Sequence, residues 1–420
     1  MLAPLTIDRL APLIRGAREI YVSGCAAEIP GLPEMLAAAT PAVVTGIFSP
    51  LLNTRSYAEP AAGRRCRTFF LNKELKVHLR EGWVDFCPWS YSQIHVWLCA
   101  PKRFDVAIVM VSPADAAGLH SFGVQSDFIP DLYERVGRLV GIVNPNMPST
   151  FGEPGIPSDR FDALLELNHP LLATPAGDRS SPPDDATTQI ASRISAMIPD
   201  GATVQMGMGR LPQALTAELT GHRNLQVHAG LVDDGILLLD DAGALNPDRP
   251  VVTGTAIGTS SLYERLHKNS RFSFRAVRHT HSREAISTIP GFIAVNAGLQ
   301  IDLFGQISSE GSGERLLASP GGLPEFVRGA RASTGGRAIA AIQAKRGREG
   351  ESSVVARLDP PYLVTTPHTD TDTVVTEYGI AELRGLSLDE RAEAIIAIAA
   401  PEHRSALAES WSDIRARGLS

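Results

Sequence analysis

Residues 203–209 of the chain read Thr-Val-Gln-Met-Gly-Met-Gly, and residues 225–228 read Leu-Gln-Val-His. Both stretches have the apolar and β-branched composition of a buried strand. The segment between them, Leu211–Leu219, has apolar residues at the spacing of a helix that packs on one face. A strand, a helix and a second strand in this order predict parallel strands joined by a helical crossover, and therefore an α/β fold.

The same alternation of elements extends outward from this stretch. A helix is expected over Gln189–Ile198, ahead of an Asp-Gly turn at residues 200–201. Ser387 and Glu390 have the spacing of a capping box before a helix over Arg391–Ala399. An amphipathic helix is expected near the N-terminus, where Ile7 and Ile14 belong to its apolar face. Further strands are expected over Glu19–Ser23, Ala42–Ile47, Val106–Val111 and Leu139–Val143. Further helices are expected over Leu32–Ala39 and Ile129–Val136.

The length of the chain and one break in its composition predict two domains. A chain of 420 residues exceeds the usual size of a single hydrophobic core. Thr174–Thr188 is rich in proline, glycine, serine and aspartate, and this composition is typical of a surface linker. We therefore predict an α/β domain over 1–173, a linker over 174–188 and a second α/β domain over 189–420. Both are expected to be open and to contain mainly parallel sheets.

The charge and the cysteines limit the class of protein. The 39 basic and 46 acidic residues give a formal net charge of −7, which argues against a nucleic-acid-binding protein. No stretch approaches the roughly 20 apolar residues of a membrane span, and charged residues interrupt the N-terminal apolar pattern that a secretory signal would need. The four cysteines have no zinc-site spacing, so they are expected to be reduced thiols in a cytoplasmic protein. No membrane partner and no metal site are expected.

Two glycine-containing clusters are candidate binding elements. In the first, Gln205, Gly207 and Gly209 lie where a strand meets a helix, so the backbone and the helix N-terminus are open to a ligand. A tight turn with positive φ explains the same glycines. The second cluster contains two glycine pairs, Gly321-Gly322 and Gly335-Gly336. Paired glycines can form an anion or oxyanion nest, although two flexible loops around a short helix fit them equally well.

Other candidates lie in loops and in a basic group. Two prolines stiffen the loop Val143–Gly152, so Met147 and Pro148 either line a site or belong to a rigid connector. Lys345, with Arg346 and Arg348, can bind phosphates or simply be solvated.

The histidines give one further candidate for catalysis. His279 and His281 lack a third ligand at a suitable spacing, so we do not predict a metal site. His228 follows a predicted strand and precedes Gly230 and Asp233. It is either a proton-transfer residue or a hydrogen-bonded structural residue.

These clusters, in this order, resemble the acetyl-CoA hydrolase/transferase family, which includes 4-hydroxybutyrate, succinyl and propionyl CoA-transferases. The most specific stretch is Val-Val-Thr-Glu-Tyr-Gly-Ile-Ala at 374–381, followed by Leu-Arg-Gly at 383–385. Further similar segments, in chain order, are 111–123, 144–152, 205–209, 302–306, 321–336 and 401–404. The resemblance implies two similar CoA-transferase-type α/β domains, a homodimer, and coenzyme A as a co-substrate without a tightly bound cofactor.

The resemblance also implies a departure at the catalytic position. In family members, a glutamate after His-Thr attacks the acyl-CoA carbonyl and forms an acyl–glutamyl anhydride. His228 matches the family histidine and Asp234-Gly235 the following Asp-Gly, so the glutamate falls on Gly230. Ala229 replaces the threonine. Gln300 and His368 stand where many relatives have glutamate and arginine.

Three interpretations of the missing glutamate remain open. In the first, water or another nucleophile attacks the thioester directly, with His228 or Asp233 as general base and glycine amides as the oxyanion hole. In the second, Asp233 or Asp234 replaces the glutamate and conventional CoA transfer continues. In the third, the chain binds acyl-CoA without turning it over, or supports an active partner. The direct route is the leading hypothesis.

Overall fold

The computed structural model describes residues 2–39, 42–175, 182–312, 315–316, 318–347, 350–358 and 363–418. The chain divides into two compact units. Unit 1 contains Met1–Arg179, Gly230–Asp234 and Pro250–Thr280. Unit 2 contains Ser180–Ala229, Gly235–Arg249 and His281–Ser420. The domain boundaries expected from the sequence, with a linker over 174–188, stay a prediction, and the predicted linker falls partly outside the described residues.

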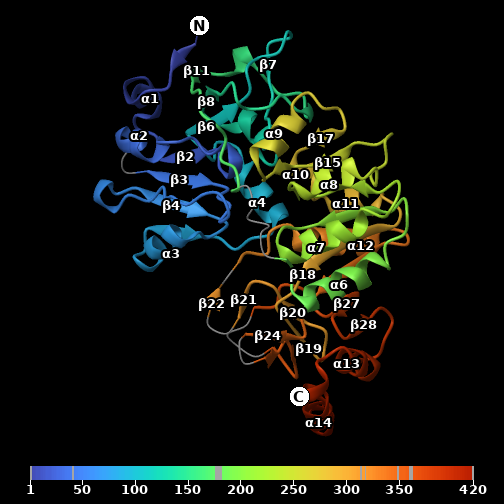
Figure 1. Ribbon diagram of the computed structural model, residues 1–420. Helices are drawn as coiled ribbons and strands as arrows, with labels where there is room; N and C mark the ends of the chain where they lie inside the picture. Colours follow the sequence, from blue (N-terminus) through green and yellow to red (C-terminus); the bar gives the residue numbers. More distant parts are fainter. Residues whose placement is uncertain are drawn as a thin grey trace. The chain divides into compact units, whose positions relative to one another are not determined.

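The centre of unit 1 is an eight-stranded parallel sheet. Its strands, in spatial order, are β1 (Ala3–Pro4), β11 (Ala163–Glu166), β8 (Arg138–Val143), β6 (Val106–Val111), β2 (Glu19–Val22), β3 (Val43–Gly46), β4 (Arg65–Thr68) and β5 (Val84–Phe86). Figure 1 shows β2, β3 and β4 side by side in the blue part of the chain. From β2 the chain builds the sheet first toward β5 and then, from β6, in the opposite direction. The order of the strands therefore reverses between β2 and β6.

The composition of the strands explains this sheet. All six residues of β6 are buried, as expected for a strand that has helices or loops on both faces of a parallel sheet. The four strands predicted for this half of the chain are confirmed as β2, β3, β6 and β8, with ends that differ by one residue at most.

The helices of unit 1 are short. They are α1 (Ile7–Ile14), α2 (Leu32–Met35), α3 (Lys73–Arg80), α4 (Tyr91–Leu98), α5 (Ile129–Leu132), α9 (Ser260–Leu266) and α10 (Val277–Thr280). The predicted helices over Leu32–Ala39 and Ile129–Val136 each begin as predicted. Each then tightens into a 3₁₀ turn, Leu36–Ala38 and Tyr133–Arg135. Further 3₁₀ turns lie at Cys25–Ala27, Pro60–Ala62 and Ser158–Arg160.

Three small sheets complete unit 1. They pair β7 (Leu119–His120) with β10 (Ile156–Pro157), β14 (Leu231–Val232) with β16 (Thr255–Ala256), and β15 (Val251–Thr253) with β17 (Phe272–Phe274) and β9 (Phe151–Gly152). The β14–β16 pair matters for the site, because β14 follows directly after Gly230.

The centre of unit 2 is a six-stranded sheet that is parallel except for its last strand. Its spatial order is β13 (Gln226–Val227), β12 (Thr203–Met206), β18 (Phe292–Ala297), β23 (Arg337–Ala341), β27 (Thr373–Thr376) and β28 (Gly379–Glu382). The predicted strand–helix–strand unit is therefore confirmed. The chain turns from β13 back past β12 to β18, so the strand order reverses between β12 and β18.

The helices of unit 2 are α6 (Asp185–Ser195), α7 (Arg210–Leu219), α8 (Gly235–Asp241), α11 (Arg283–Ser287), α12 (Leu323–Ala332), α13 (Leu388–Ala397) and α14 (Pro401–Ala416). The helix predicted over Gln189–Ile198 begins earlier, because the Asp184 carboxylate accepts the Thr187 N–H at 2.8 Å and caps α6. Residues 185–188, which the sequence assigned to the linker, are therefore helical. The predicted capping box is confirmed, with Ser387 and Glu390 bonded reciprocally at the start of α13.

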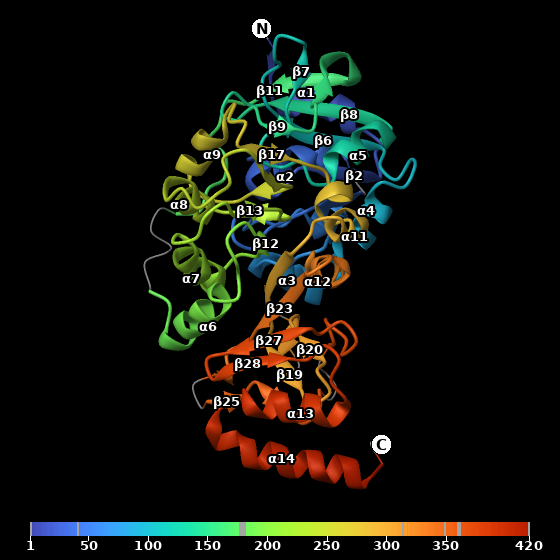
Figure 2. The same ribbon diagram turned by 90° about the vertical axis from the view of Figure 1, so that its right-hand side faces the viewer.

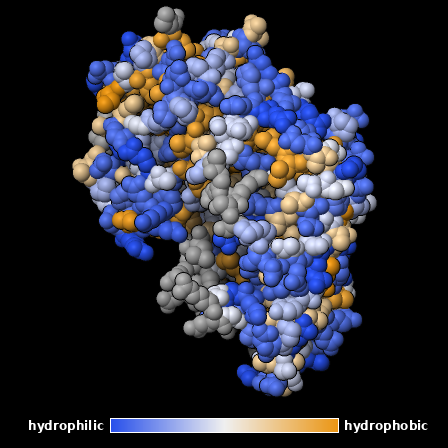
Figure 3. All heavy atoms as spheres, in the orientation of Figure 1, coloured by the Kyte–Doolittle hydropathy of each residue, from blue (hydrophilic) through white to orange (hydrophobic). Residues whose placement is uncertain are grey.

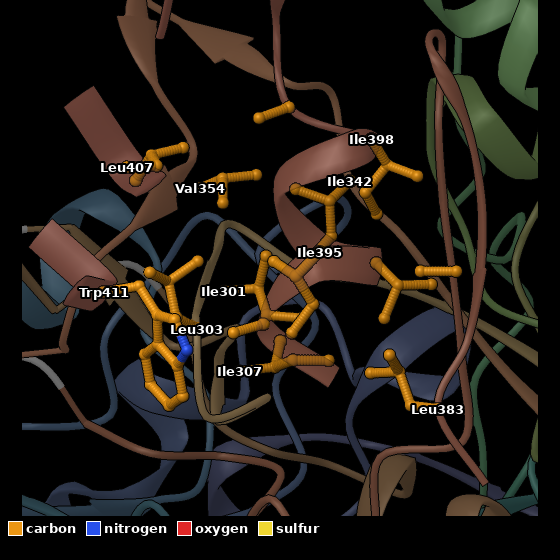
Figure 4. Packing of buried hydrophobic residues seen from close by; sticks show 14 residues of the cluster. Ile301, Leu303, Ile307, Ile342, Val354, Leu383, Ile395, Ile398, Leu407 and Trp411 are labelled. Carbon is orange, nitrogen blue, oxygen red and sulfur yellow. The ribbon is translucent and has the colours of Figure 1, made fainter. Parts of the chain in front are cut away.

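A hydrophobic cluster fixes the C-terminal helices of unit 2. Figure 2 shows α13 next to β27 and β28, with α14 beside α13 at the end of the chain. Side chains from β19 (Gln300–Asp302), β26 (Val354–Val355) and these two helices meet in Figure 4, where Trp411 and Leu407 approach Ile301 and Val354. The remaining strands are β20 (Ile307–Ser308), β21 (Gly311–Ser312), β22 (Arg315–Leu316), β24 (Lys345–Arg346) and β25 (Glu351–Ser352).

The surface is mainly polar on the face drawn in Figure 3, where hydrophobic side chains form small groups between hydrophilic ones. Within the described part of the chain, none of the helices has both the length and the apolar character that crossing a membrane requires.

Candidate functional site

Unit 2 has a pocket where its strand order reverses. The pocket has a volume of about 280 Å³ and lies at the carboxyl ends of β12, β18 and β23. Ligands of open α/β sheets bind at this kind of crevice. Its lining includes Arg210 and Leu211 after β12, Ala297, Gly298 and Leu299 around the end of β18, and Ala341 and Gln343 around the end of β23.

Three cationic side chains line this pocket, namely Arg210, Lys345 and Arg346. Lys345 Nζ lies 3.0 Å from the Glu402 carboxylate, and this hydrogen bond raises the pKa of the lysine. Arg346 lies 3.2 Å from the Glu351 carboxylate. The structure thus brings the predicted Lys345 together with the first residue of α7. Arg348, the third member of the predicted basic group, lies outside the described residues.

The glycines after β12 fit both a tight turn and a backbone that is open to a ligand. Gly209 has a φ of 118°, which favours glycine, and it is the N-cap residue of α7. Gly207 and Gly209 are exposed, and a Cβ on either would contact no atom within 4 Å. The turn therefore explains Gly209, and the open backbone before α7 is compatible with a ligand. Gln205 is buried, and its amide exchanges hydrogen bonds of 3.4 and 3.1 Å with Asn296 on β18.

The two glycine pairs lie at opposite ends of α12. Gly321 has a φ of 57°, and Gly322 precedes the helix as its N-cap. A Cβ on Gly322 would lie 2.4 Å from Nε2 of His281, so only glycine allows this approach. At this helix start Leu323 N–H donates to the Pro320 carbonyl and Phe326 N–H to the Gly322 carbonyl, both at 3.2 Å, and Pro324 has no N–H.

The second pair has a structural explanation. A Cβ on Gly336 would lie 2.2 Å from the Ala330 carbonyl oxygen, and Gly335 has a φ of 70°. The pair closes the C-terminal end of α12 and leads into β23.

His228 lies in the interior of unit 2. It is 6% exposed, and its ring packs edge-on against Phe292 with centroids 5.9 Å apart. Burial is the main cause that lowers the pKa of the His281 side chain to about 3, and the electrostatic effect of the nearby His228 is the second cause. The structure therefore places His228, His281 and the Gly321–Gly322 turn in one region of unit 2.

Gly230, two residues after His228, belongs to unit 1. Its carbonyl oxygen accepts hydrogen bonds from the N–H groups of Gly254 and Thr255, both at 3.1 Å. Asp233 follows β14 and is half-buried. The Asp234 carboxylate accepts from the N–H and the hydroxyl of Thr259, the residue directly before α9.

The structure shows where the other residues singled out from the sequence lie. Met147 and Pro148 are buried, and they fill the space where a side chain at Gly123 would lie. Gln300 is 1% exposed, and among the described residues its side-chain amide has no hydrogen-bond partner. His368 is exposed, and its carbonyl accepts from Arg391. The four cysteines are free thiols. In the described part of the chain, no group of three or more His, Cys, Asp or Glu side chains is arranged to hold a metal ion.

A buried acid, Asp127, was missed by the sequence analysis. It is 1% exposed, and burial raises the pKa of its carboxyl group to about 7. Its partner Thr255 is 128 residues away in the chain. Nothing in the sequence next to Asp127 indicates a hydrogen-bond partner so far away in the chain.

The comparisons with known proteins agree with this architecture. Residues 258–411 match the acetyl-CoA hydrolase/transferase C-terminal domain. The 4-hydroxybutyrate coenzyme A transferase of Clostridium kluyveri is 34% identical over 340 residues, which cover 78% of this chain and 77% of that protein. Acetyl-CoA hydrolases are among the other matches. The chain belongs to the acetyl-CoA hydrolase/transferase family.

Solved structures of similar proteins extend the match over almost the whole chain. RipA from Yersinia pestis is 28% identical with a TM-score of 0.86, covering 98% of each chain. A 4-hydroxybutyrate CoA-transferase from Porphyromonas gingivalis is 26% identical with a TM-score of 0.77, covering 99% of this chain and 98% of that one. The protein is therefore an acyl-CoA-processing enzyme of this family, with the predicted α/β fold and mainly parallel sheets.

Proposed function

We propose that this enzyme cleaves acyl-CoA thioesters by direct attack of water or another acyl acceptor, without an acyl–glutamyl anhydride. The observation that supports this route is the residue at position 230. Glycine offers no nucleophile, and its backbone is held in place by Gly254 and Thr255. A covalent intermediate at this position would require a side chain that the chain lacks.

The conventional route with a substitute carboxylate is less well supported. The carboxylate of Asp234 is engaged in hydrogen bonds from the N–H and the hydroxyl of Thr259. Asp233 and His228 remain the proton acceptors predicted from the sequence. Backbone N–H groups at Gly321 and Gly322 would stabilise the oxyanion, because they precede the N-terminus of α12.

The cationic pocket of unit 2 would bind the phosphates of coenzyme A. Arg210, Lys345 and Arg346 line it, and cations are the usual partners of phosphate groups. Coenzyme A would act as a co-substrate, and no tightly bound cofactor is needed for this chemistry. We further propose a homodimer in the cytoplasm, on the strength of the family alone, and sedimentation analysis tests the oligomeric state.

A thiol-release assay tests the proposed route. The protein is mixed with a panel of acyl-CoAs, with and without carboxylate acceptors, and free CoA thiol is followed. We expect release without an acceptor and no borohydride-trappable adduct. Release only with a carboxylate, together with an adduct, would show conventional transfer. Binding without any turnover would show a silent acyl-CoA-binding protein.

Four variants sharpen this assay. His228→Ala is expected to abolish turnover if His228 is the base, and Asp233→Asn makes the same test for Asp233. Gly230→Glu restores a carboxylate at the family position, so it should gain transferase activity and the trappable adduct. A Gly230→Gln variant is the matched control, because it has the same size without the nucleophile.

A further inference from the structure

Three short segments of unit 1 lie side by side around Gly230. Gly254 and Thr255 donate to the Gly230 carbonyl, and β16 pairs with β14 directly after it. On the other side, Ala256 N donates to Val124 O at 2.9 Å, and Gln125 bridges to Thr255. The segment 124–127 is therefore separated from Gly230 by one strand only.

The absence of a side chain at Gly254 lets Asp127 approach Gly230. A Cβ on Gly254 would lie 2.5 Å from Oδ1 of Asp127 and 3.1 Å from the Gly230 carbonyl oxygen. The carboxylate and the Gly230 backbone thus border the same space. The Asp127 backbone has a φ of 36°, in the left-handed region, which indicates that this orientation is held by its surroundings.

Asp127 and Gln125 both have unused hydrogen-bonding capacity. Oδ2 of Asp127 accepts from the Thr255 hydroxyl. Within the described ranges, Oδ1 of Asp127 and both amide atoms of Gln125 are buried without a hydrogen-bond partner. Each residue is 1% exposed. Unsatisfied buried polar atoms of this kind cost about 1–3 kcal/mol each, and native proteins keep few of them.

The location in the sheet also favours a ligand. The charge of Asp127 is one of the causes that raise the pKa values of Tyr21 on β2 and of Cys25 just beyond the end of that strand, so the three side chains are near one another. The strand order of unit 1 reverses next to β2, between β2 and β6. Open α/β sheets commonly bind their ligands near a reversal of this kind.

We propose that Gln125 and Asp127 hold the attacking water beside Gly230 and that Asp127 accepts its proton. This inference rests on the proposed direct route and assigns its base to a carboxylate of unit 1, in place of His228 or Asp233. The water oxygen forms a bond to the thioester carbonyl carbon while its proton passes to Oδ1 of Asp127. The C–S bond then breaks, and the departing CoA thiolate takes that proton, which leaves the free acid and CoA.

The environment of Asp127 suits this role. Burial is the main cause that raises its pKa to about 7, opposed by the Thr255 hydrogen bond. A base is most effective when its pKa is near the working pH. Burial raises the pKa values of Tyr21 and Cys25, and the charge of Asp127 raises them further, so both side chains stay uncharged in this range. Hydrolysis should therefore increase with pH and level off above about 7.

The test is Asp127→Asn, which keeps the shape of the side chain and removes the base. Hydrolysis should fall by roughly 10²- to 10⁴-fold, and the increase of the rate around pH 7 should disappear, while the affinity for CoA stays unchanged. Asp159→Asn, an exposed aspartate of the same unit, is the matched control. A folded Asp127→Asn protein that keeps the rate and the pH profile of the wild type would overturn the proposal.

A second variant decides the case in which Asp127→Asn fails to fold. Gln125→Met removes the amide with little change of volume, and it leaves no hydrogen bond unpaired because the amide has none among the described residues. Slower hydrolysis with an unchanged midpoint in the pH profile supports the proposal, and an unchanged rate overturns it. Turnover that persists in Asp127→Asn overturns this inference alone, whereas a wild-type protein without any hydrolysis overturns the proposed function as well.

Discussion

In unit 1 a side chain near β2, beside the reversal of strand order, is buried and acidic, whereas at the reversal in unit 2 the pocket is lined by partly exposed basic side chains. Asp127 is almost completely inaccessible and has one carboxylate oxygen without a partner among the described residues. Lys345 and Arg346 are partly open to solvent and form ion pairs. The same position in two α/β sheets therefore supports different tasks. Burial prepares an acid for proton transfer, and exposure prepares cations for binding a phosphorylated ligand.

The largest expected effect concerns the stability of unit 1. Because the pKa of Asp127 is raised to about 7 in the folded protein, the folded state binds more protons than the unfolded state between about pH 4 and 7. Stability from this group is therefore present at low pH and is lost as the pH rises to about 7. Asp127→Asn abolishes this pH-dependent loss of the free energy of unfolding. The loss is on the order of 4 kcal/mol, at about 1.4 kcal/mol per pKa unit.

Thermal unfolding across this pH range checks the expectation. The midpoint of Asp127→Asn minus that of the wild type should increase from pH 4 to 7 and then stay constant. Other titrating groups cancel in the difference. A difference that does not vary with pH would show that Asp127 does not titrate in this window, and the contrast between the two units would lose its basis.

The next effect tests the close approach over Gly254. Gly254→Ala places a methyl group 2.5 Å from Oδ1 of Asp127, so the carboxylate must move. Overpacking of this kind costs roughly 1–3 kcal/mol, and we expect acyl-CoA hydrolysis to fall at least about tenfold. Gly221→Ala is the control, since a Cβ there meets no atom within 4 Å. Equal hydrolysis rates in the two variants would contradict the role given to this contact.

A smaller effect is expected in unit 2. Arg210→Ala and Lys345→Ala should each raise KM for acyl-CoA about tenfold, as expected for a lost charge-assisted hydrogen bond, with kcat nearly unchanged. Arg283→Ala, on an exposed helix position outside the pocket, should leave KM unchanged. An acyl-dephospho-CoA substrate identifies the phosphate concerned. If the substituted residue binds the missing phosphate, its substitution should raise KM less with this substrate than with acyl-CoA. A loss of kcat would instead show that the pocket is not a binding site.

The smallest effect concerns the ion pair of Arg346. Glu351→Gln removes the carboxylate that competes with a phosphate for this arginine. Because an exposed ion pair is weak, KM for acyl-CoA should fall by less than about fivefold, and only at low salt. Steady-state kinetics in low and high salt measure this. An increase of KM would mean that Glu351 positions the arginine for the ligand.

The sequence predicted the sheets better than the site. Val106–Val111 is recognisable as a buried strand because six apolar residues follow one another, and Ser387 and Glu390 are recognisable as a capping box because their spacing is local. Asp127 was not predictable in this way, since its environment comes from Gly254, Thr255 and Tyr21, which are distant in the chain. Met147 and Pro148 were predicted to line a site or stiffen a loop. The packing against Gly123 favours the second interpretation.

The order in which the chain builds unit 1 has a consequence for its biosynthesis. Gly230–Asp234 and Pro250–Thr280 belong to unit 1, although the chain builds parts of unit 2 before and between them. A ribosome must therefore release about two thirds of the polypeptide before Thr255 can reach Asp127. Until then, Asp127 lacks its hydrogen bond from Thr255, and Val124 lacks its bond from Ala256. A fragment that ends before residue 250 lacks part of unit 1 and should therefore not form the complete unit.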